Sequence, residues 1–437
     1  MKKILILGGA NLHCKLVRAA KEMGLYTVVT DYLVDSPAKK IADESWMLNV
    51  MDVDAIVQRC REEGIDAVLS THLDPCQRPY YEICHKLGVP CYIDTWDQVF
   101  SLTDKNAFKA ACIRNGVDII PTYQETEADA IEYPVLVKPA HSRGSRGQTV
   151  CESALALDEA LRKAKKESDD GIAIIEKYMG NKGDFSMTYI FVDGKPCLTR
   201  TSDRYLGSLA LGLEKVGIGT VSPSHYTQMY IDNVEPRILK MLSDLHIKNG
   251  PVFMQGFVDG ETVRFYDPGY RFPGSEFDEM YAKHTGIDLI KMMIEFAMTG
   301  NMNNRYHSLY DGMVKMDGNA AIVLFPVIRD GKIARVDGLD AISRLKGVYG
   351  YTTRHKVGED VPFTKDVNQR FGEIDIICDS FAALKATLHE VFRLLHVIDS
   401  EGLDMLHGNI DVEAIKAPAA SRRAENREEM RNGRCGN

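Results

Sequence analysis

The chain has 437 residues, of which 45% are hydrophobic and 26% charged, and its formal net charge is −9. This composition is typical of a globular soluble protein, and the length suggests about three domains. The negative charge argues against a general binder of nucleic acid or of anionic membranes, because either would need a basic face. No stretch approaches the roughly 18 apolar residues of a membrane helix. The first residues fit a β-strand better than a signal peptide, so we expect a cytoplasmic protein.

The ten cysteines are scattered without a CxxC pair, and the cysteine and histidine spacings match no zinc template. Buried, reduced thiols are therefore expected, as in a reducing compartment. Neither a disulfide framework nor a structural zinc site is predicted.

Short apolar runs alternate with helical patterns over residues 1–97. This alternation predicts a parallel sheet covered by helices on both faces. Ligands of such sheets gather at the carboxyl ends of the strands, which here carry Gly8-Gly9-Ala10-Asn11, Asp31 and Ser70–Asp74. The strands are expected at 4–7, 26–30, 67–70 and 91–93, and the helices at 12–23, near 53–63 and ending at 87.

The pair Gly8-Gly9 resembles the start of a dinucleotide-binding fingerprint, but Leu12 and His13 stand where the later glycines of GxGxxG should be. Tight-turn glycines are the preferred interpretation, and a dehydrogenase is the least favoured function. Asp31 is interpreted as a strand-end residue near a substrate pocket.

Residues 98–300 have a different pattern, which begins with a helix capped by Thr103 and ending near Gly116. A strand over 133–139 places Lys138 next to a loop of His, Ser, Arg and Gly at 141–147. A charged helix and a short strand lead to Glu176–Met179. Two hairpins follow, with strands at 185–192 and 196–201 and at 252–258 and 262–266, separated by a helix near 236–247.

Residues 301–417 combine strands at 321–328, 332–336 and 373–378 with a helix from Ser380 to about His396, which predicts an α+β domain. Residues 418–437 are rich in Arg, Glu, Asn and Ala without an apolar period. They are expected to form a disordered tail.

The loop after Lys138 is a candidate anion site. Small residues let main-chain N–H groups approach an anion closely, while serine and arginine add donors. Charge-assisted hydrogen bonds contribute roughly 1.5–3 kcal/mol each, so several together could hold a triphosphate. The loop lacks the Walker A pattern, and a flexible surface turn is the alternative interpretation.

The order of these segments carries more information than each alone. Lys105, Lys138 with its loop, Glu176–Met179, Asp184 and Asp267–Arg271 together resemble the ATP-grasp superfamily, which includes biotin carboxylase, carbamoyl phosphate synthetase and the L-amino-acid ligases. The resemblance covers residues 1–396. It implies a pre-ATP-grasp Rossmann-like domain at 1–97, an ATP-grasp domain at 98–300 with a mobile lid subdomain at 119–177, and a C-terminal α+β domain at 301–417.

The resemblance also implies roles for individual residues. Lys105 and Lys138 would hold the ATP phosphates, Lys138 would also be catalytic, and Asp184 would bind the ribose. Arg271 would face the transferred phosphate or the substrate carboxylate, since a guanidinium matches either anion. Arg204 is a weaker candidate in the same cleft. The lid over the phosphates would include Ser142, Arg143, Gly144 and Ser145, and the adenine hinge would comprise Glu176, Lys177, Tyr178 and Met179.

The expected metal site departs from the family pattern, which has a Glu on one late strand and Glu-x-Asn-x-Arg on the next. Gln255 stands at the first place, and Asp267-Pro268-Gly269-Tyr270-Arg271 at the second. Because magnesium takes hard oxygen ligands, Asp267 and Gln255 are the predicted ligands of Mg²⁺, for which Mn²⁺ could substitute. Candidate helpers are Glu261, Glu276 and Asp278.

The implied activity is that of an ATP-dependent carboxylate–amine ligase, which forms an acyl phosphate and then an amide or peptide bond and releases ADP and phosphate. Its partners would be small-molecule carboxylates and amines, not nucleic acid or membrane, and a homodimer is compatible with the sequence. Two alternatives stay open. One is a carboxyphosphate-forming enzyme that uses bicarbonate, although no biotin-carrier or glutaminase segment is present. The other is a degenerate, non-catalytic ATP-binding protein, which Gln255 and Gly269 favour.

Overall fold

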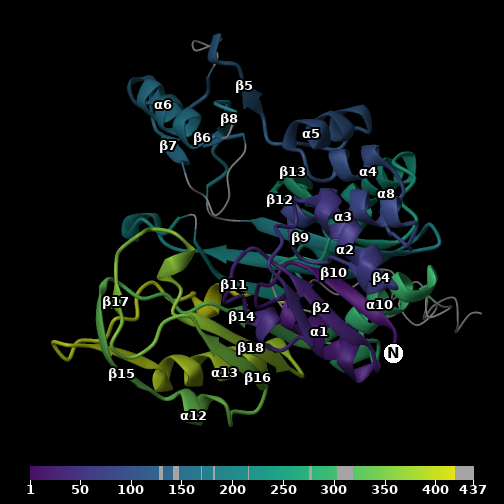
Figure 1. Ribbon diagram of the computed structural model, residues 1–437. Helices are drawn as coiled ribbons and strands as arrows, with labels where there is room; N and C mark the ends of the chain where they lie inside the picture. The colour runs from purple at the N-terminus through teal and green to yellow at the C-terminus, as the bar shows by residue number, and fades with distance from the viewer. Residues whose placement is uncertain are drawn as a thin grey trace, which may run out of the picture.

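The computed structural model describes residues 1–126, 131–140, 147–168, 170–180, 183–214, 216–274, 278–302 and 318–418. In Figure 1 a small sheet with one helix stands above a large sheet, the N-terminal layers pack against that sheet, and the C-terminal part extends it on the other side. The helices within these ranges are all too short or too polar to cross a bilayer.

The N-terminal domain contains a four-stranded parallel sheet in the order β3-β2-β1-β4. Its strands are almost wholly buried, which parallel sheets require because helices cover both faces. The tight-turn interpretation of Gly8 is confirmed by its φ of 98°. The elements are β1 (Lys3–Leu7), α1 (His13–Glu22), β2 (Tyr26–Thr30), η1 (Pro37–Lys40), β3 (Glu44–Trp46), α2 (Val53–Glu63), β4 (Ala67–Leu69) and α3 (Asp74–Leu87).

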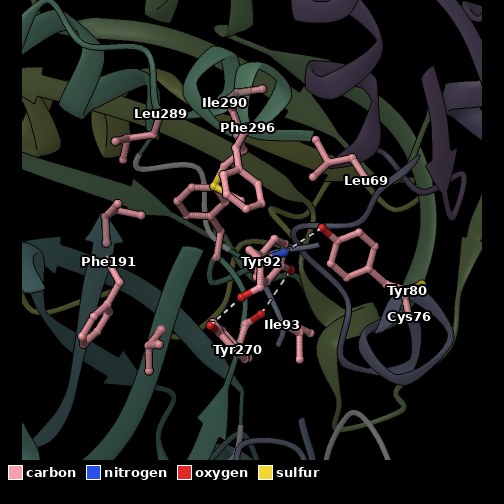
Figure 2. Close-up of a cluster of buried hydrophobic side chains, with 14 of the residues drawn as sticks. Leu69, Cys76, Tyr80, Tyr92, Ile93, Phe191, Tyr270, Leu289, Ile290 and Phe296 are labelled. Carbon is pink, nitrogen blue, oxygen red and sulfur yellow. Dashed lines mark hydrogen bonds between the residues drawn. The ribbon is translucent and has the colours of Figure 1, made fainter. Parts of the chain in front are cut away.

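The strand predicted at 91–93 is wrong, because this segment is irregular and crosses toward the large sheet. Tyr92 is fully buried, and its hydroxyl lies 2.7 Å from Ser70 O and 2.8 Å from Gln77 Oε1. The hydroxyl of Tyr270 in turn lies 2.8 Å from both Tyr92 O and Asn249 O. Figure 2 shows these tyrosines meeting inside a cluster of apolar side chains. The segment therefore joins two domains through side chains and carbonyl groups.

A small antiparallel sheet, β5-β8-β6-β7, forms most of the predicted lid subdomain. One face is covered by an amphipathic helix, α6, which buries Leu157, Ala160, Leu161 and Ala164 at helical spacing. This sheet and helix have a hydrophobic core of their own. The elements are β5 (Thr122–Tyr123), β6 (Val135–Pro139), β7 (Thr149–Cys151), η3 (Ala154–Ala156), α6 (Leu157–Glu167) and β8 (Ala173–Lys177).

Two helices, α4 (Trp96–Ser101) and α5 (Lys105–Arg114), lead into this small sheet. The cap of α5 is Asp104, not Thr103, since Asp104 Oδ1 accepts from Asn106 N at 2.9 Å and Ala107 N at 2.8 Å. The Thr103 hydroxyl instead donates back to Val99 O. Capping by Asp104 fixes the first turn of α5, which carries Lys105.

The large sheet has the order β13-β12-β9-β10-β11-β14-β18-β16, and each neighbouring pair is antiparallel. The predicted hairpin turn at Asp193-Gly194 is confirmed, with φ values of 50° and 78°. β11 pairs with β14, so the sheet runs without a break across the domain boundary expected at residue 300. The strands are β9 (Asp184–Val192), β10 (Lys195–Leu206), β11 (Gly217–Ser222), β12 (Gly250–Asp259), β13 (Thr262–Gly269), β14 (Ala320–Leu324), β16 (Val348–Thr353) and β18 (Gly372–Cys378).

The remaining elements cover the large sheet or close the C-terminal part. Ser380 caps α13 by accepting from Ala383 N at 3.1 Å, and a second small sheet has the order β17-β15-β19. These elements are η4 (Leu209–Leu211), α7 (Thr227–Met229), the π-helix η5 (Tyr230–Val234), α8 (Glu235–Asp244), α9 (Asp278–Thr285), α10 (Leu289–Thr299), β15 (Gly331–Asp337), α12 (Leu339–Ile342), β17 (Asp360–Val361), η7 (Val367–Gln369), α13 (Phe381–Leu394), β19 (His396–Asp399) and η8 (Val412–Ala414).

The expectation of free thiols is confirmed for the described part of the chain, where nine cysteines are free and all but Cys91 are buried. Cys435 and most of the tail predicted at 418–437 lie outside the described residues.

Replacing Tyr270 by Phe should lower the free energy of unfolding by about 1–3 kcal/mol, because the single hydroxyl hydrogen shared between Tyr92 O and Asn249 O is lost. The change is read as a shift of the urea midpoint, followed by tryptophan fluorescence. Tyr351→Phe, on the exposed strand β16, is the matched control and should leave the midpoint unchanged. Equal midpoints for the two variants would contradict a joining role for Tyr270.

Candidate functional site

One face of the large sheet gathers polar side chains from four strands. The register pairs Gln255 with Asp267 and Arg204 with Asp184, so these side chains point to the same side of the sheet. Asp184 is buried and accepts from Gln255 Nε2 at 2.9 Å, from Arg204 at 3.0 Å and from the Tyr266 hydroxyl at 3.3 Å. Burial raises the pKa of Asp184, while these three donors favour the carboxylate.

Tyr266 owes its place to a break in register. Gln255 faces Asp267 across the two strands, but Gly256 already faces Phe265, so β13 carries one extra residue. Such a bulge re-aims a side chain, and here it brings the Tyr266 hydroxyl to Asp184. The Tyr266 ring also lies 5.9 Å from Lys138 Nζ, which connects this face to the small sheet above it.

Glu176 on β8 is buried between two lysines. Its Oε2 is 2.5 Å from Lys138 Nζ and its Oε1 is 2.5 Å from Lys109 Nζ. Burial acts to raise the pKa of Glu176, but the two ammonium groups hold it below the ordinary value. The carboxylate therefore stays charged and fixes both lysine side chains.

The four residues expected to form the adenine hinge lie at the end of β8 and just beyond it. The Glu176 side chain is directed at lysines, and that of Lys177 is exposed, 3.9 Å from Glu132. The main-chain N–H groups of Lys177 and Tyr178 donate to Pro121 O at 2.9 Å and Pro134 O at 3.0 Å. A base edge would have to be read by other main-chain groups of residues 176–179. The hinge stays a prediction.

Lys105, Lys138 and Asp267 share one region, as the sequence predicts. The pKa of Lys105 is lowered, mainly by burial and secondly by the charge of Lys138. The carboxylates of Asp267 and Glu176 act in the opposite direction and raise it. The pKa of Asp267 is raised, mainly by burial and secondly by the charge of Asp74. The three nearby cations, Arg271, Lys105 and Lys138, act to lower it. Four cations, those of Lys105, Lys109, Lys138 and Arg271, face the three carboxylates of Glu176, Asp267 and Asp74. The one positive charge in excess favours a polyanion.

Arg271 follows β13 and is held from the N-terminal domain. Its Nε and one NH₂ group donate to the two oxygens of Asp74 at 2.5 and 2.7 Å, and the other NH₂ group donates to Phe272 O at 2.9 Å. Its guanidinium also lies 5.4 Å from the Phe253 ring. Burial opposes its charge, yet Asp74 raises the pKa of Arg271. One edge of this predicted catalytic arginine is thus occupied by a carboxylate in the first turn of α3.

A second buried group lies where the N-terminal strands end. Lys15 pairs with Asp278 at 2.8 Å, and the rings of His13 and His72 are 6.4 Å apart. Burial lowers the pKa of His13 to about 4, so its imidazole is neutral at pH 7. Both ring nitrogens of His13 are buried without a hydrogen-bond partner.

Several of these residues escaped sequence reasoning. Lys109 follows Lys105 by four positions, one helical turn, and that spacing was the available signal. Asp74 lies in the strand-end segment 70–74, whereas the bulge at Tyr266 and the Lys15–Asp278 pair left no local signal.

Not every predicted residue can be placed. Ser142, Arg143, Gly144, Ser145 and Glu276 lie outside the described residues.

For a metal ion, the described ranges contain no group of three or more His, Cys, Asp or Glu side chains suited to hold one. Of the proposed helpers, Asp278 pairs with Lys15, and Glu261 is in the turn after β12, six positions or roughly 20 Å along the strand from Asp267. Asp267 and Gln255 therefore stand as neighbouring oxygen donors.

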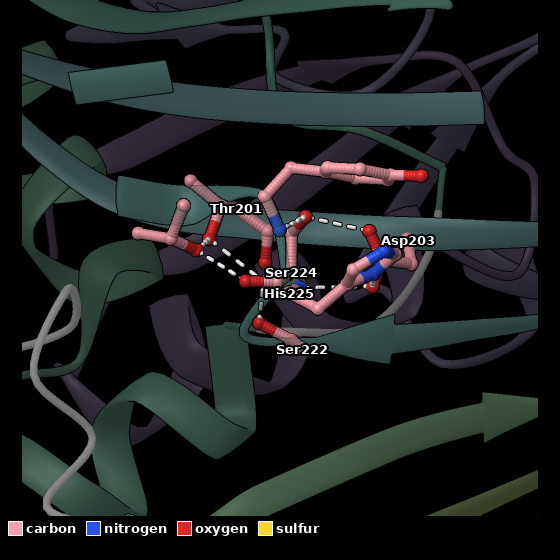
Figure 3. Close-up of polar contacts among 7 residues, drawn as sticks. Thr201, Asp203, Ser222, Ser224 and His225 are labelled. Carbon is pink, nitrogen blue, oxygen red and sulfur yellow. Dashed lines mark hydrogen bonds and ion pairs between the residues drawn. The ribbon is translucent and has the colours of Figure 1, made fainter. Parts of the chain in front are cut away.

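On the opposite face of the sheet, Asp203, Ser224 and His225 come together (Figure 3). The Ser224 hydroxyl donates to Asp203 Oδ1 at 2.5 Å, and His225 Nδ1 is 2.6 Å from Asp203 Oδ2. Both partners bind the carboxylate, so the histidine does not activate the serine as it does in a hydrolytic triad. The cluster ties the segment that follows β11 to strand β10.

Glu176→Gln should lower the free energy of unfolding by about 3–5 kcal/mol at pH 7, because two buried lysines lose their counter-charge. Glu132→Gln, whose side chain is 77% exposed, is the control and should change it by about 1 kcal/mol or less. Since the folded pKa of Glu176 is lowered, its stabilisation is present above the unfolded pKa of about 4.3 and is lost below it. Urea titrations from pH 8 to 4 should therefore show that the difference in free energy of unfolding between the unsubstituted protein and Glu176→Gln begins to decrease near pH 4. A deficit no larger than the control's would contradict the buried-pair assignment.

Comparison with known proteins agrees with this architecture. Residues 104–189 match the family model of the carbamoyl-phosphate synthase L chain, ATP binding domain. The 2-oxoglutarate carboxylase small subunit of Hydrogenobacter thermophilus is 28% identical over 202 residues, which are 41% of this chain and 43% of that one. A formate-dependent phosphoribosylglycinamide formyltransferase of Sulfurisphaera tokodaii is 25% identical over 213 residues, 46% of this chain and 53% of that one. The chain thus spans about half or less of these curated relatives.

Solved structures match over more of the chain. The L-amino acid ligase of Bacillus licheniformis has a TM-score of 0.75 at 18% identity and covers 92% of this chain and 99% of its own. A phosphoribosylglycinamide synthetase of Anaerococcus prevotii has a TM-score of 0.70 at 16% identity, with 91% and 100% covered. The biotin carboxylase domain of the Hydrogenobacter 2-oxoglutarate carboxylase, solved with MgADP and bicarbonate, has a TM-score of 0.67 at 18% identity, with 91% and 90% covered. The resemblance inferred from the sequence is confirmed at this level: the chain has the fold of the ATP-grasp ligases.

Proposed function

We propose that the chain is an ATP-dependent carboxylate–amine ligase that joins a small-molecule carboxylate to an amine and releases ADP and phosphate. The observation that carries this proposal is the proximity of Lys105, Lys138 and Asp267. The charges of Lys138 and Asp267 act on the pKa of Lys105, and Arg271 acts on the pKa of Asp267. Cations, one carboxylate and an arginine are the groups that phosphoryl transfer to a carboxylate needs.

The residues present fit a magnesium–nucleotide complex. Lys105 and Lys138 offer ammonium groups from two sides, and Asp267 and Gln255 offer hard oxygens on adjacent strands. Magnesium, when bound there with ATP, would neutralise the terminal phosphates.

The proposed chemistry follows from the weakness of a carboxylate as an electrophile. Transfer of the terminal phosphoryl group gives an acyl phosphate, the amine attacks its carbonyl carbon, and phosphate leaves. Lys138 and Lys105 would hold the phosphates in line. Arg271 would orient the carboxylate with the N–H hydrogens that Asp74 and Phe272 O leave unused. These residues position and neutralise charge, and none of them forms a covalent bond.

The direct assay is a screen of amino acids and small carboxylates, each with amines, for ADP release, followed by mass analysis of products. An amide or peptide product supports the proposal. Rapid ADP release with bicarbonate as the sole acceptor would favour the carboxyphosphate-forming alternative. Nucleotide binding without ADP release in every mixture of carboxylate and amine would favour a non-catalytic binding protein. The neutral side chain of Gln255 at the expected metal site is the feature that favours this alternative.

Lys138→Ala should abolish ADP release, because a phosphate-holding cation is lost and Glu176 loses one partner. Lys346→Ala, at a lysine that is 92% exposed, should retain full turnover. Circular dichroism spectra that match the unsubstituted protein would establish that both variants fold. Unchanged turnover in folded Lys138→Ala would remove this lysine from the site.

Asp267→Asn should raise the magnesium concentration needed for half-maximal ADP release at least ~10-fold, because the charged ligand becomes neutral. Asp379→Asn, at an exposed carboxylate, is the control for the same chemical change. An identical magnesium titration for both variants would count against Asp267 as a metal ligand.

A further inference from the structure

The side chain of Gln255 is oriented by Asp184. Gln255 Nε2 donates to Asp184 Oδ1 over 2.9 Å, in a buried position. An ionised carboxylate has no hydrogen to donate, so the amide must present its NH₂ group to Asp184. Its carbonyl oxygen is then turned away from Asp184. The side chain across the other edge of β12 is Asp267, the register partner of Gln255.

Asp184 is itself held in place. Its side chain is fully buried, Arg204 pairs with Oδ2 at 3.0 Å, and the Tyr266 hydroxyl lies 3.3 Å from Oδ1. The Arg204 guanidinium keeps a cation beside the carboxylate, which favours its charged form. Asp184 therefore has a fixed position and acts as the hydrogen-bond acceptor next to Gln255.

A carboxylate at position 255 would meet this acceptor without water between them. A glutamate in the orientation of Gln255 would bring its oxygen to hydrogen-bond distance of Asp184, with no proton available to join them. Two carboxylates that close cannot both ionise cheaply in a buried place. Asp184 thus requires a neutral side chain at position 255.

We propose that Asp184 fixes residue 255 as a neutral amide ligand, so that the site takes a single divalent cation with the nucleotide, between Asp267 and the amide oxygen of Gln255. This inference rests on the proposed nucleotide site, and it specifies how many divalent cations bind there with each nucleotide. One carboxylate with nucleotide phosphates is sufficient for one magnesium ion. The nearby carboxylates Asp184 and Asp74 are paired with Arg204 and Arg271, and the described part of the chain holds no group of three or more His, Cys, Asp or Glu side chains suited to a metal ion.

The cation number is measured on the full chain with Mn²⁺ and a non-hydrolysable ATP analogue, by electron paramagnetic resonance of protein-bound Mn²⁺. One Mn²⁺ per bound analogue is expected. Two per analogue, or binding of the analogue without protein-bound Mn²⁺, would overturn the inference while leaving the proposed function standing. If the analogue does not bind at all, the proposed function fails and the cation number fails with it.

The requirement that Asp184 places on residue 255 is tested separately, without metal or nucleotide. The test is a double-mutant cycle that measures melting temperatures. Gln255→Glu should lower the melting temperature by at least ~4 °C, and the same change in an Asp184→Asn background should cost less than half of that. Gln58→Glu is the matched control, because Gln58 Nε2 also donates to a carboxylate, Glu62 Oε1 at 2.8 Å, but on an exposed helix face. Equal costs of Gln255→Glu in the two backgrounds would overturn the role of Asp184, whatever the nucleotide results.

Discussion

The pairing of Glu176 with Lys138 and Lys109 is the interaction on which the arrangement of the site depends. Lys138 lies on β6, Glu176 on the neighbouring β8 and Lys109 on α5, so one buried carboxylate ties the small sheet to the helix beneath it. Burying these charges is costly, and the short contacts on both carboxylate oxygens offset that cost. Lys105, one turn before Lys109, is brought to the same region and adds a cation that the local carboxylates only partly balance. The remaining positive charge suits a polyphosphate.

The other half of the site is positioned by three consecutive residues after β13. The Tyr270 hydroxyl reaches Tyr92 O, Arg271 pairs with Asp74, and Phe272 N donates to Thr71 O at 2.8 Å. Each contact crosses to the N-terminal domain, and Thr71 and Asp74 follow the carboxyl end of β4. The strand that carries Asp267 is therefore anchored just beyond that residue, and this holds the end of β13 against the N-terminal domain.

The sequence was sufficient for features with local causes and insufficient for those with tertiary ones. Strand and helix periods located β2, α2 and both hairpins, and the resemblance to the family motif marked Asp267–Arg271, which spans the end of β13. Thr103 and Asp104 are both good caps, and only the geometry of α5 decides between them. The apolar segment 91–93 reads as a strand, but its polar groups find partners in another domain. Tyr266 could not be predicted, since its direction comes from a bulge that no residue type requires.

The two departures from the family pattern have neighbours that match them. At position 255 the amide lies against a fixed carboxylate, Asp184, where a second charge would be unfavourable. At position 269 a Cβ atom would stand 3.0 Å from Arg271 Cγ and 3.2 Å from its Nε, so any side chain there would press on the arginine that Asp74 holds. Gln255 with Asp184, and Gly269 with Arg271, are therefore matched in geometry, so each departure from the family pattern fits the side chain beside it.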